Sequence, residues 1–109
     1  MSDFDNYALK AATTAIYPPD RGLEYLGLGL TSEAGEVAGK IKKLIRDKDG
    51  YVDYDAAMDL AAELGDVLWY VAMLCNHIGI SMQHVADGNI IKLASRQTRG
   101  ALQGSGDNR

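Results

Sequence analysis

The sequence lacks the features typical of secreted or membrane-bound proteins, namely paired cysteines and long apolar segments. Its single cysteine, Cys75, cannot form a disulfide within the chain, which fits a reducing compartment. No apolar stretch approaches the roughly 20 residues of a membrane helix. The opening residues MSDFDNY are acidic and lack the apolar segment of a secretory signal. We therefore expect a cytoplasmic protein with no membrane partner.

Basic residues are also in deficit, because 15 acidic residues outnumber 11 basic ones and give a net charge of −4. A surface of this charge repels nucleic acid polymers, so we expect no such partner. A protein of this charge that acts on phosphates must supply its own cations. These would be metal ions or local groups of lysine and arginine.

What the chain does contain favours packed helices. Hydrophobic residues make up 47% of the sequence, although aromatic residues make up only 7%. Their periodic spacing predicts helices over 3–17, 22–46, 53–78 and 82–95. Pro18-Pro19 should end the first helix, and Asp53 or Asp55 should begin the third. Gly79 should end the third helix, and Ser81 should cap the fourth.

These elements predict a single all-α domain over residues 1–109 with a four-helix, bundle-like fold. Val85, Ile90 or Ile91, and Leu93 are expected to face inward from the last helix. Because so short a chain buries little surface, we expect a homodimer or homotetramer. Residues 96–109 are basic and glycine-rich without a helical seam, which predicts a C-terminal tail or a phosphate-facing flap.

Four carboxylates occur as two pairs with helical spacing. Glu33 and Glu36 are three residues apart, as are Glu63 and Asp66, so each pair projects from one helical face. If the two helices pack antiparallel, the carboxylates converge and need a shared hard cation, Mg²⁺ or alternatively Mn²⁺. Alternatively, the four carboxylates lie on exposed helix faces and bind no metal. Their spacing alone does not decide between these two interpretations.

A di-iron site is disfavoured because it requires Glu-x-x-His motifs. Neither His77 nor His84 follows a glutamate by three residues.

At these positions the chain resembles the MazG-like family of all-α nucleotide pyrophosphohydrolases. The similarity lies in S-E-A-G-E at 32–36 and E-L-G-D at 63–66, and continues through N-I-I-K-L-A at 89–94 to the closing G-S-G-D-N-R. Ser32 departs from the family, which usually has a glutamate there. The metal ligands implied by the resemblance are Glu33, Glu36, Glu63 and Asp66. The resemblance also implies a catalytic proton acceptor, for which we expect Glu36 or alternatively Glu33, because Ser32 leaves this role open.

Further residues are expected to bind the substrate. Asn89 and Lys92 are implied by the resemblance, Tyr70 or its neighbour Trp69 could stack on a base, and guanidinium groups suit polyphosphate. A solvated surface, a buried aromatic or a disordered tail is the alternative interpretation for each. The full predicted set is Lys40, Tyr70, Asn89, Lys92, Arg96, Arg99 and Arg109.

The resemblance implies Mg²⁺-dependent hydrolysis of a nucleoside triphosphate to a nucleoside monophosphate and pyrophosphate. A dNTP is the expected substrate, and removal of unwanted nucleotides is the expected role. A phosphoribosyl-ATP pyrophosphohydrolase and a dUTPase-like relative are the enzymatic alternatives. The non-enzymatic alternative is a helical dimerisation or regulatory module without activity.

Overall fold

The computed structural model describes residues 3–109, so the first two residues of the expected domain lie outside it. Within that range the chain is helical and contains no strand, which confirms the predicted all-α class and its four helices. The elements are α1 (Asp3–Ala12), the short 3₁₀ helix η1 (Pro19–Arg21), α2 (Gly22–Lys48), α3 (Tyr54–Ile78) and α4 (Met82–Thr98). None of these helices is both long and apolar enough to cross a lipid bilayer.

Local chemistry sets most of the helix ends. Asp53 accepts a hydrogen bond from the Ala56 amide at 2.8 Å and caps α3, and Ser81 caps α4 through the His84 amide at 3.1 Å. Gly79 ends α3 in the left-handed conformation at φ 76°. The caps predicted from sequence are therefore confirmed.

The first helix is shorter than predicted. It ends at Ala12 and does not continue to residue 17. The hydroxyls of Thr13 and Thr14 bond back to the carbonyls of Lys10 and Ala11, at 2.7 Å and 2.8 Å. These bonds stabilise a turn in competition with further helix, so Pro18-Pro19 lies beyond the helix end.

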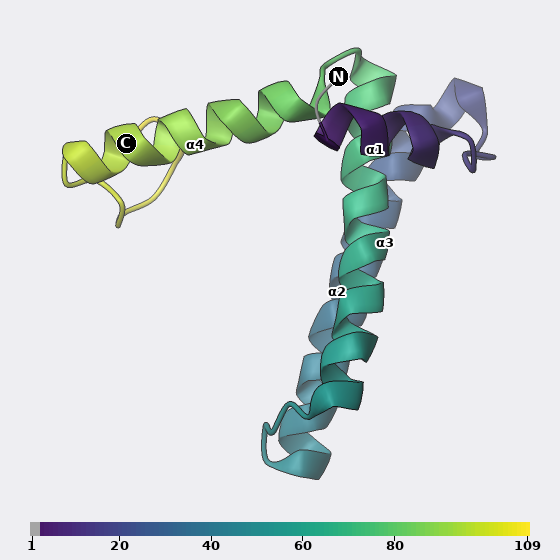
Figure 1. The fold of residues 1–109 in the computed structure, drawn as a ribbon, viewed down its shortest axis with the longest axis vertical. Helices are drawn as coiled ribbons and strands as arrows, with labels where there is room; N and C mark the ends of the chain where they lie inside the picture. Colours follow the sequence, from purple (N-terminus) through teal and green to yellow (C-terminus); the bar gives the residue numbers. More distant parts are fainter. Residues whose placement is uncertain (1–2) are drawn as a thin grey trace.

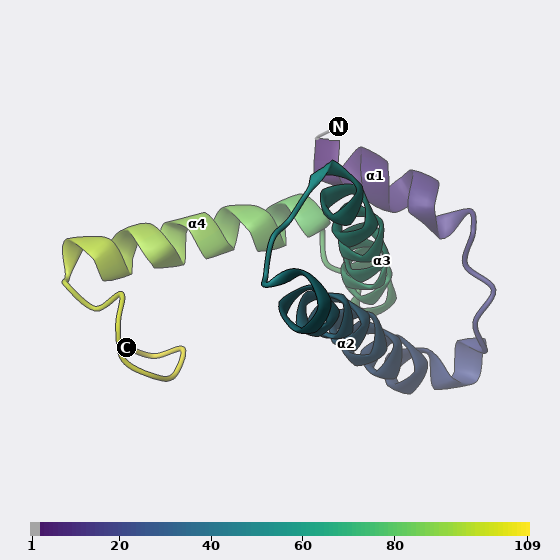
Figure 2. The ribbon, with the colours of Figure 1, turned by 90° about the horizontal axis from the view of Figure 1, so that it is seen from below.

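The two longest helices form an antiparallel pair. α2 has 27 residues and α3 has 25, and they run side by side along their lengths (Figures 1 and 2). Asp49, at φ 53°, and the glycine after it turn the chain between them. The several glycines of α2 do not interrupt it. Gly29 instead lies so close to the Tyr70 ring of α3 that a Cβ there would overlap it.

The buried core lies at one end of this helix pair, where α1 crosses α3 and α4 begins (Figure 1). Cys75 is buried there and its thiol is free, as expected from its apolar surroundings. The core consists of Ala8, Ala11, Leu26, Ala72, Met73, Cys75 and Met82. This core is small, because about half of the large apolar side chains of α2 and α3 remain exposed.

Helix α4 leaves that core as an arm and does not contact α2 (Figure 1). The radius of gyration is 16.7 Å, against about 13 Å for a compact chain of this length. Val85, Ile90, Ile91 and Leu93 are exposed, so the prediction that they face inward is wrong for the single chain. Among residues 3–109, only α2 and α3 pair along their lengths, and the four helices do not close into a bundle within one chain.

The C-terminal segment comprises the last turn of α4 and a stretch of chain without helix. Helix α4 continues to Thr98, three residues beyond its predicted end, and Arg96 is buried on it. After Gly100 the chain folds back along α4, as Figure 2 shows.

Candidate metal centre and adjoining pocket

Three carboxylates from two helices meet near the middle of the α2–α3 pair. Glu33 projects from α2, while Glu63 and Asp66 project from one face of α3. Each offers an oxygen that lies within 4.8 Å of the oxygens offered by the other two. The antiparallel pairing of the helices therefore brings together three of the four carboxylates predicted to bind metal.

Repulsion among the carboxylates contributes to a raised pKa of Glu33. Partial burial is the largest cause that raises the pKa of its carboxyl, and the charges of Asp66, Glu63 and Glu36 raise it further. A divalent cation would relieve this repulsion. All the donor atoms are oxygens, which Mg²⁺ and Mn²⁺ prefer. The three carboxylates are therefore suited to hold either ion.

Glu36 lies beside this group but outside it. Its side chain is exposed, and it does not share the close approach of the other three oxygens. Its charge is nevertheless near enough to raise the pKa values of Glu33 and Lys40. Glu36 is thus placed at the solvent side of the cluster.

Lys40 forms an ion pair with the carboxylate cluster. Its Nζ forms an ion pair with Glu63 Oε1 at 3.1 Å and donates a longer hydrogen bond to the Asp59 carbonyl at 3.4 Å. The hydrogen bond to Glu63 is the main cause that raises the pKa of Lys40. The ammonium group is therefore charged and within reach of anything bound at Glu63.

An open pocket of about 350 Å³ adjoins the cluster. Its aromatic wall is formed by Trp69 and Tyr70, whose rings meet edge to face with centroids 4.9 Å apart. Its lining comprises Thr14, Glu33, Asp66, Trp69 and Tyr70. The pocket thus joins an aromatic surface directly to two of the three clustered carboxylates.

Contacts on both sides fix this aromatic wall. Trp69 Nε1 donates to Thr14 Oγ1 at 2.9 Å and to the Ala11 carbonyl at 3.3 Å, which ties α3 to the chain just after α1. Tyr70 lies against Gly29, where the missing side chain leaves room for the ring. Burial is the main cause of the raised pKa of Tyr70, so its hydroxyl is neutral at physiological pH.

Comparison with known proteins agrees with this geometry. A family model described as the MazG nucleotide pyrophosphohydrolase domain matches residues 21–100. A curated relative, the Gene 37 protein of Mycobacterium phage L5, is 50% identical over 111 aligned residues, covering 96% of this chain and 97% of the relative. The chain belongs to the MazG nucleotide pyrophosphohydrolase family. No solved structure gives a significant match.

The family match confirms the resemblance drawn from the sequence and supports nucleotide pyrophosphohydrolase activity. The matched range of this MazG domain contains α2, α3 and α4, and so includes all the clustered carboxylates and Lys40. Thr14 lies before it.

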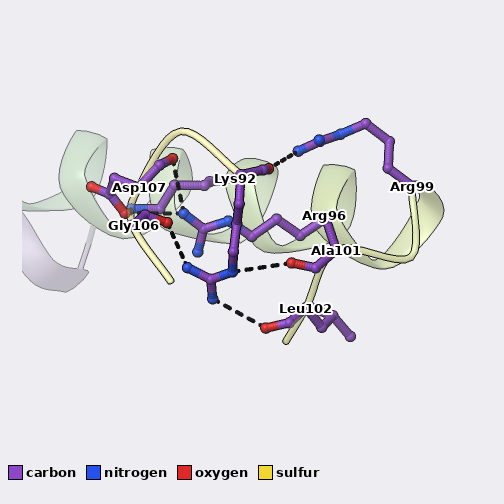
Figure 3. A network of polar contacts seen from close by, with 8 residues as sticks. Lys92, Arg96, Arg99, Ala101, Leu102, Gly106 and Asp107 are labelled. Atoms are coloured by element: carbon purple, nitrogen blue, oxygen red, sulfur yellow. Dashed lines mark hydrogen bonds and ion pairs between the residues drawn. The ribbon is translucent and has the colours of Figure 1, made fainter. Parts of the chain in front are cut away.

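The remaining predicted substrate ligands lie elsewhere in the chain. They belong to α4 and the segment after it, which do not contact α2 and are not brought to the carboxylates of the same chain. Asn89 is exposed on α4. Lys92, Arg96 and Arg99 instead contact the folded-back tail, as Figure 3 shows. Arg109 belongs to that tail and donates to the Ala101 carbonyl within it.

Two pocket residues were not among the predicted ligands. Trp69 neighbours Tyr70, yet on helical spacing alone it projects about 100° away from Tyr70. Thr14 is joined to Trp69 across 55 positions of sequence, so no local pattern could indicate it. The adjacent aromatic pair, Trp69-Tyr70, was the one available signal for an aromatic pocket at this point.

Proposed function

We propose that this protein hydrolyses nucleoside triphosphates, with dNTPs preferred, between the α and β phosphates. The products are a nucleoside monophosphate and pyrophosphate. The observation that carries the proposal is the junction of three carboxylates with an aromatic pocket on one face of the α2–α3 pair. The substrate must offer phosphate oxygens at one end and a planar apolar group at the other, and a nucleotide has both.

In this proposal Glu33, Glu63 and Asp66 hold Mg²⁺, and Glu36 is a further ligand or the acceptor of a proton. A bound Mg²⁺ supplies charge neutralisation at the phosphate oxygens and lowers the pKa of water. Glu36 is suited to proton acceptance because it is exposed beside the cluster. Glu33 is the alternative acceptor, since Ser32 provides no carboxylate next to it.

Lys40 and the aromatic wall orient the substrate. Lys40 approaches the phosphates from its position on Glu63 and offsets charge on the leaving pyrophosphate. Trp69 and Tyr70 stack against the base in the adjoining pocket, which holds the α phosphate at the carboxylates. Binding energy from the base thus positions the reacting phosphorus.

We further propose that two or more copies assemble, as a homodimer or homotetramer. The exposed apolar residues of α2, α3 and α4 support this. So does the position of α4, which extends away from the α2–α3 pair and leaves its own sides uncovered (Figure 1). In such an assembly α4 of one copy packs on the α2–α3 pair of another and completes a four-helix arrangement. Asn89 and the basic residues of α4 then reach a carboxylate cluster. Sedimentation of a stable monomer at micromolar concentration would contradict this assembly.

A substrate panel tests the activity most directly. Each NTP and dNTP, with phosphoribosyl-ATP beside them, is incubated with the protein and Mg²⁺, and pyrophosphate and orthophosphate are measured separately. We expect pyrophosphate, fastest from a dNTP, which fits clearance of the cytoplasmic nucleotide pool. Orthophosphate as the product would contradict the proposal, and a preference for dUTP or phosphoribosyl-ATP would reassign the substrate.

A further inference from the structure

The hydroxyl of Thr14 uses its proton and one of its two lone pairs inside the chain. Thr14 Oγ1 donates to the Ala11 carbonyl at 2.8 Å and accepts from the indole Nε1 of Trp69 at 2.9 Å. An indole nitrogen can only donate, so the second bond occupies a lone pair of the hydroxyl oxygen. The other lone pair has no donor among residues 3–109. Because Thr14 is exposed and lines the pocket beside the carboxylates, a bound molecule can reach that lone pair.

The same bonds hold the Thr14 proton away from the pocket. Turning the proton toward a bound molecule would break the bond to the Ala11 carbonyl, and the oxygen would still have to face the Trp69 indole. The Ala11 carbonyl also accepts from the Thr14 amide at 3.0 Å and from Trp69 Nε1 at 3.3 Å, so the three residues form one compact group of bonds. Thr14 therefore faces the pocket as an acceptor.

The other side-chain donors of the pocket lining are engaged as well. The Trp69 N–H is spent on the bonds just described. Burial raises the pKa of Tyr70 most, and a hydrogen bond with Tyr25 raises it further, which means that Tyr70 keeps its proton and donates it to Tyr25. Glu33 and Asp66 are acceptors when ionised. The described residues that line the pocket thus offer acceptors and no free side-chain donor.

A pocket of acceptors distinguishes nucleobases by the group that they carry opposite the sugar. Adenine and cytosine carry an amino group there, which donates, whereas uracil carries an oxo group, which accepts. Hypoxanthine likewise carries an oxo group in place of the amino group of adenine. The ring N–H of an oxo base lies beside its oxygen, so the lone pair of Thr14 would meet repulsion together with attraction. Thr14 lies at the aromatic end of the pocket, because it bonds the Trp69 indole.

We propose that Thr14 selects substrates by the amino group of the base, so that dCTP and dATP are preferred over dUTP and dITP. This selectivity rests on the proposed function, which places the base on Trp69 and Tyr70. An uncharged hydrogen bond is enough for a preference of about threefold to tenfold. Thr14 precedes residues 21–100, which the MazG family model matches, so the selection resides in a segment outside that match.

Hydrolysis of two matched substrate pairs, dCTP with dUTP and dATP with dITP, tests this selectivity. The ratio of kcat/KM within a pair is the measured quantity, because it cancels changes in stability and in overall activity. We expect a ratio of about three to ten in favour of the amino base in the unmodified protein. Thr14→Val replaces the hydroxyl by a methyl group of similar size and should bring the ratio to about one. Thr14→Ser keeps the hydroxyl and should retain the preference.

Trp69→Phe is the matched control for movement of the aromatic wall. It breaks the same bond as Thr14→Val but leaves the Thr14 hydroxyl in the pocket. We expect it to raise the KM of all four substrates and to keep the preference for the amino bases. A ratio near one or in favour of the oxo base in the unmodified protein would overturn the proposal. An unchanged ratio in Thr14→Val, or an equal loss of preference in Trp69→Phe, would overturn it too.

Binding of nucleoside monophosphates separates this inference from catalysis. Calorimetric titration with dCMP and with dUMP involves no phosphoanhydride bond, and we expect the same preference for the amino base, lost in Thr14→Val. That preference without pyrophosphate release from any triphosphate would refute the proposed function alone. Pyrophosphate release at equal rates from both members of each pair, with equal binding of dCMP and dUMP, would refute the selectivity alone.

Discussion

The indole Nε1 of Trp69 donates to the hydroxyl of Thr14 at 2.9 Å and joins the middle of α3 to the turn that follows α1. This bond fixes one wall of the pocket beside the carboxylates. The wall of the pocket therefore depends on a segment that the MazG family match does not include.

Loss of this bond should weaken nucleotide binding before it harms chemistry. Trp69→Phe keeps an aromatic surface but removes the donor, so we expect a higher KM with a smaller change in kcat, and a stability loss of about 1 kcal/mol. Steady-state kinetics and thermal denaturation measure both effects. Thr14→Val should reproduce them and Thr14→Ser should not. Additive losses in the Trp69→Phe, Thr14→Val double variant would show that the bond contributes nothing.

The clustered carboxylates should be indispensable for activity. Asp66→Asn removes a charged ligand, and we expect pyrophosphate release to fall by more than the 10–100-fold typical of losing an outer partner of a metal ligand. Circular dichroism should report an unchanged helical content. Glu24→Gln is the matched control, since it removes an equal charge from an exposed carboxylate of α2 paired only with nearby Arg21. Equal rates in Asp66→Asn and the unmodified protein would remove the cluster from the mechanism.

Mg²⁺ should stabilise the folded chain, because it relieves repulsion among Glu33, Glu63 and Asp66. At a concentration 100 times its dissociation constant, one bound ion contributes about 2.7 kcal/mol. Thermal melts with and without Mg²⁺ detect the shift, and Glu33→Gln should reduce it. A regulatory module without a metal site predicts identical melting temperatures in both conditions.

Two glycines of α2 should respond oppositely to the same substitution. Gly29→Ala places a Cβ against the Tyr70 ring, and we expect a loss of about 1–3 kcal/mol from overpacking. Gly35→Ala meets open space within the chain, and should gain about 0.5–1 kcal/mol from the higher helix propensity of alanine. Chemical denaturation at a concentration where the assembly state is constant compares them. A neutral Gly29→Ala would mean that Tyr70 is free to move aside.

Most helix boundaries could be predicted because their causes are local. Asp53, Ser81 and Gly79 act on backbone groups within four residues or on their own φ angle, so short sequence windows contain the necessary information. The same locality explains why two pairs with i, i+3 spacing indicated a carboxylate cluster. Glu33, Glu63 and Asp66 converge because a short turn joins two long helices.

The parts that sequence did not predict depend on distant contacts. The end of α1 follows from the hydroxyls of Thr13 and Thr14, and the Thr14 hydroxyl also meets Trp69, far along the chain. The direction of α4 depends on the turn after Gly79 and on packing against α1, neither of which a periodic pattern specifies. The burial of Arg96 likewise depends on a tail that has no helical seam. Each of these required knowledge of which segments meet in space.

The contact between Gly29 and Tyr70 has a consequence for ion selectivity. Gly29 precedes Glu33 by one turn of α2, and Tyr70 follows Asp66 by one turn of α3, so this contact lies in the layer next to the carboxylates. The carboxylates come from opposite helices, and the spacing of the helices therefore sets the distance across the cluster. Mg²⁺ binds oxygen at about 2.0–2.1 Å and Ca²⁺ at about 2.3–2.6 Å. Enlarging residue 29 would widen the gap and shift the preference of the cluster toward the larger ion, although residue 29 bears no ligand.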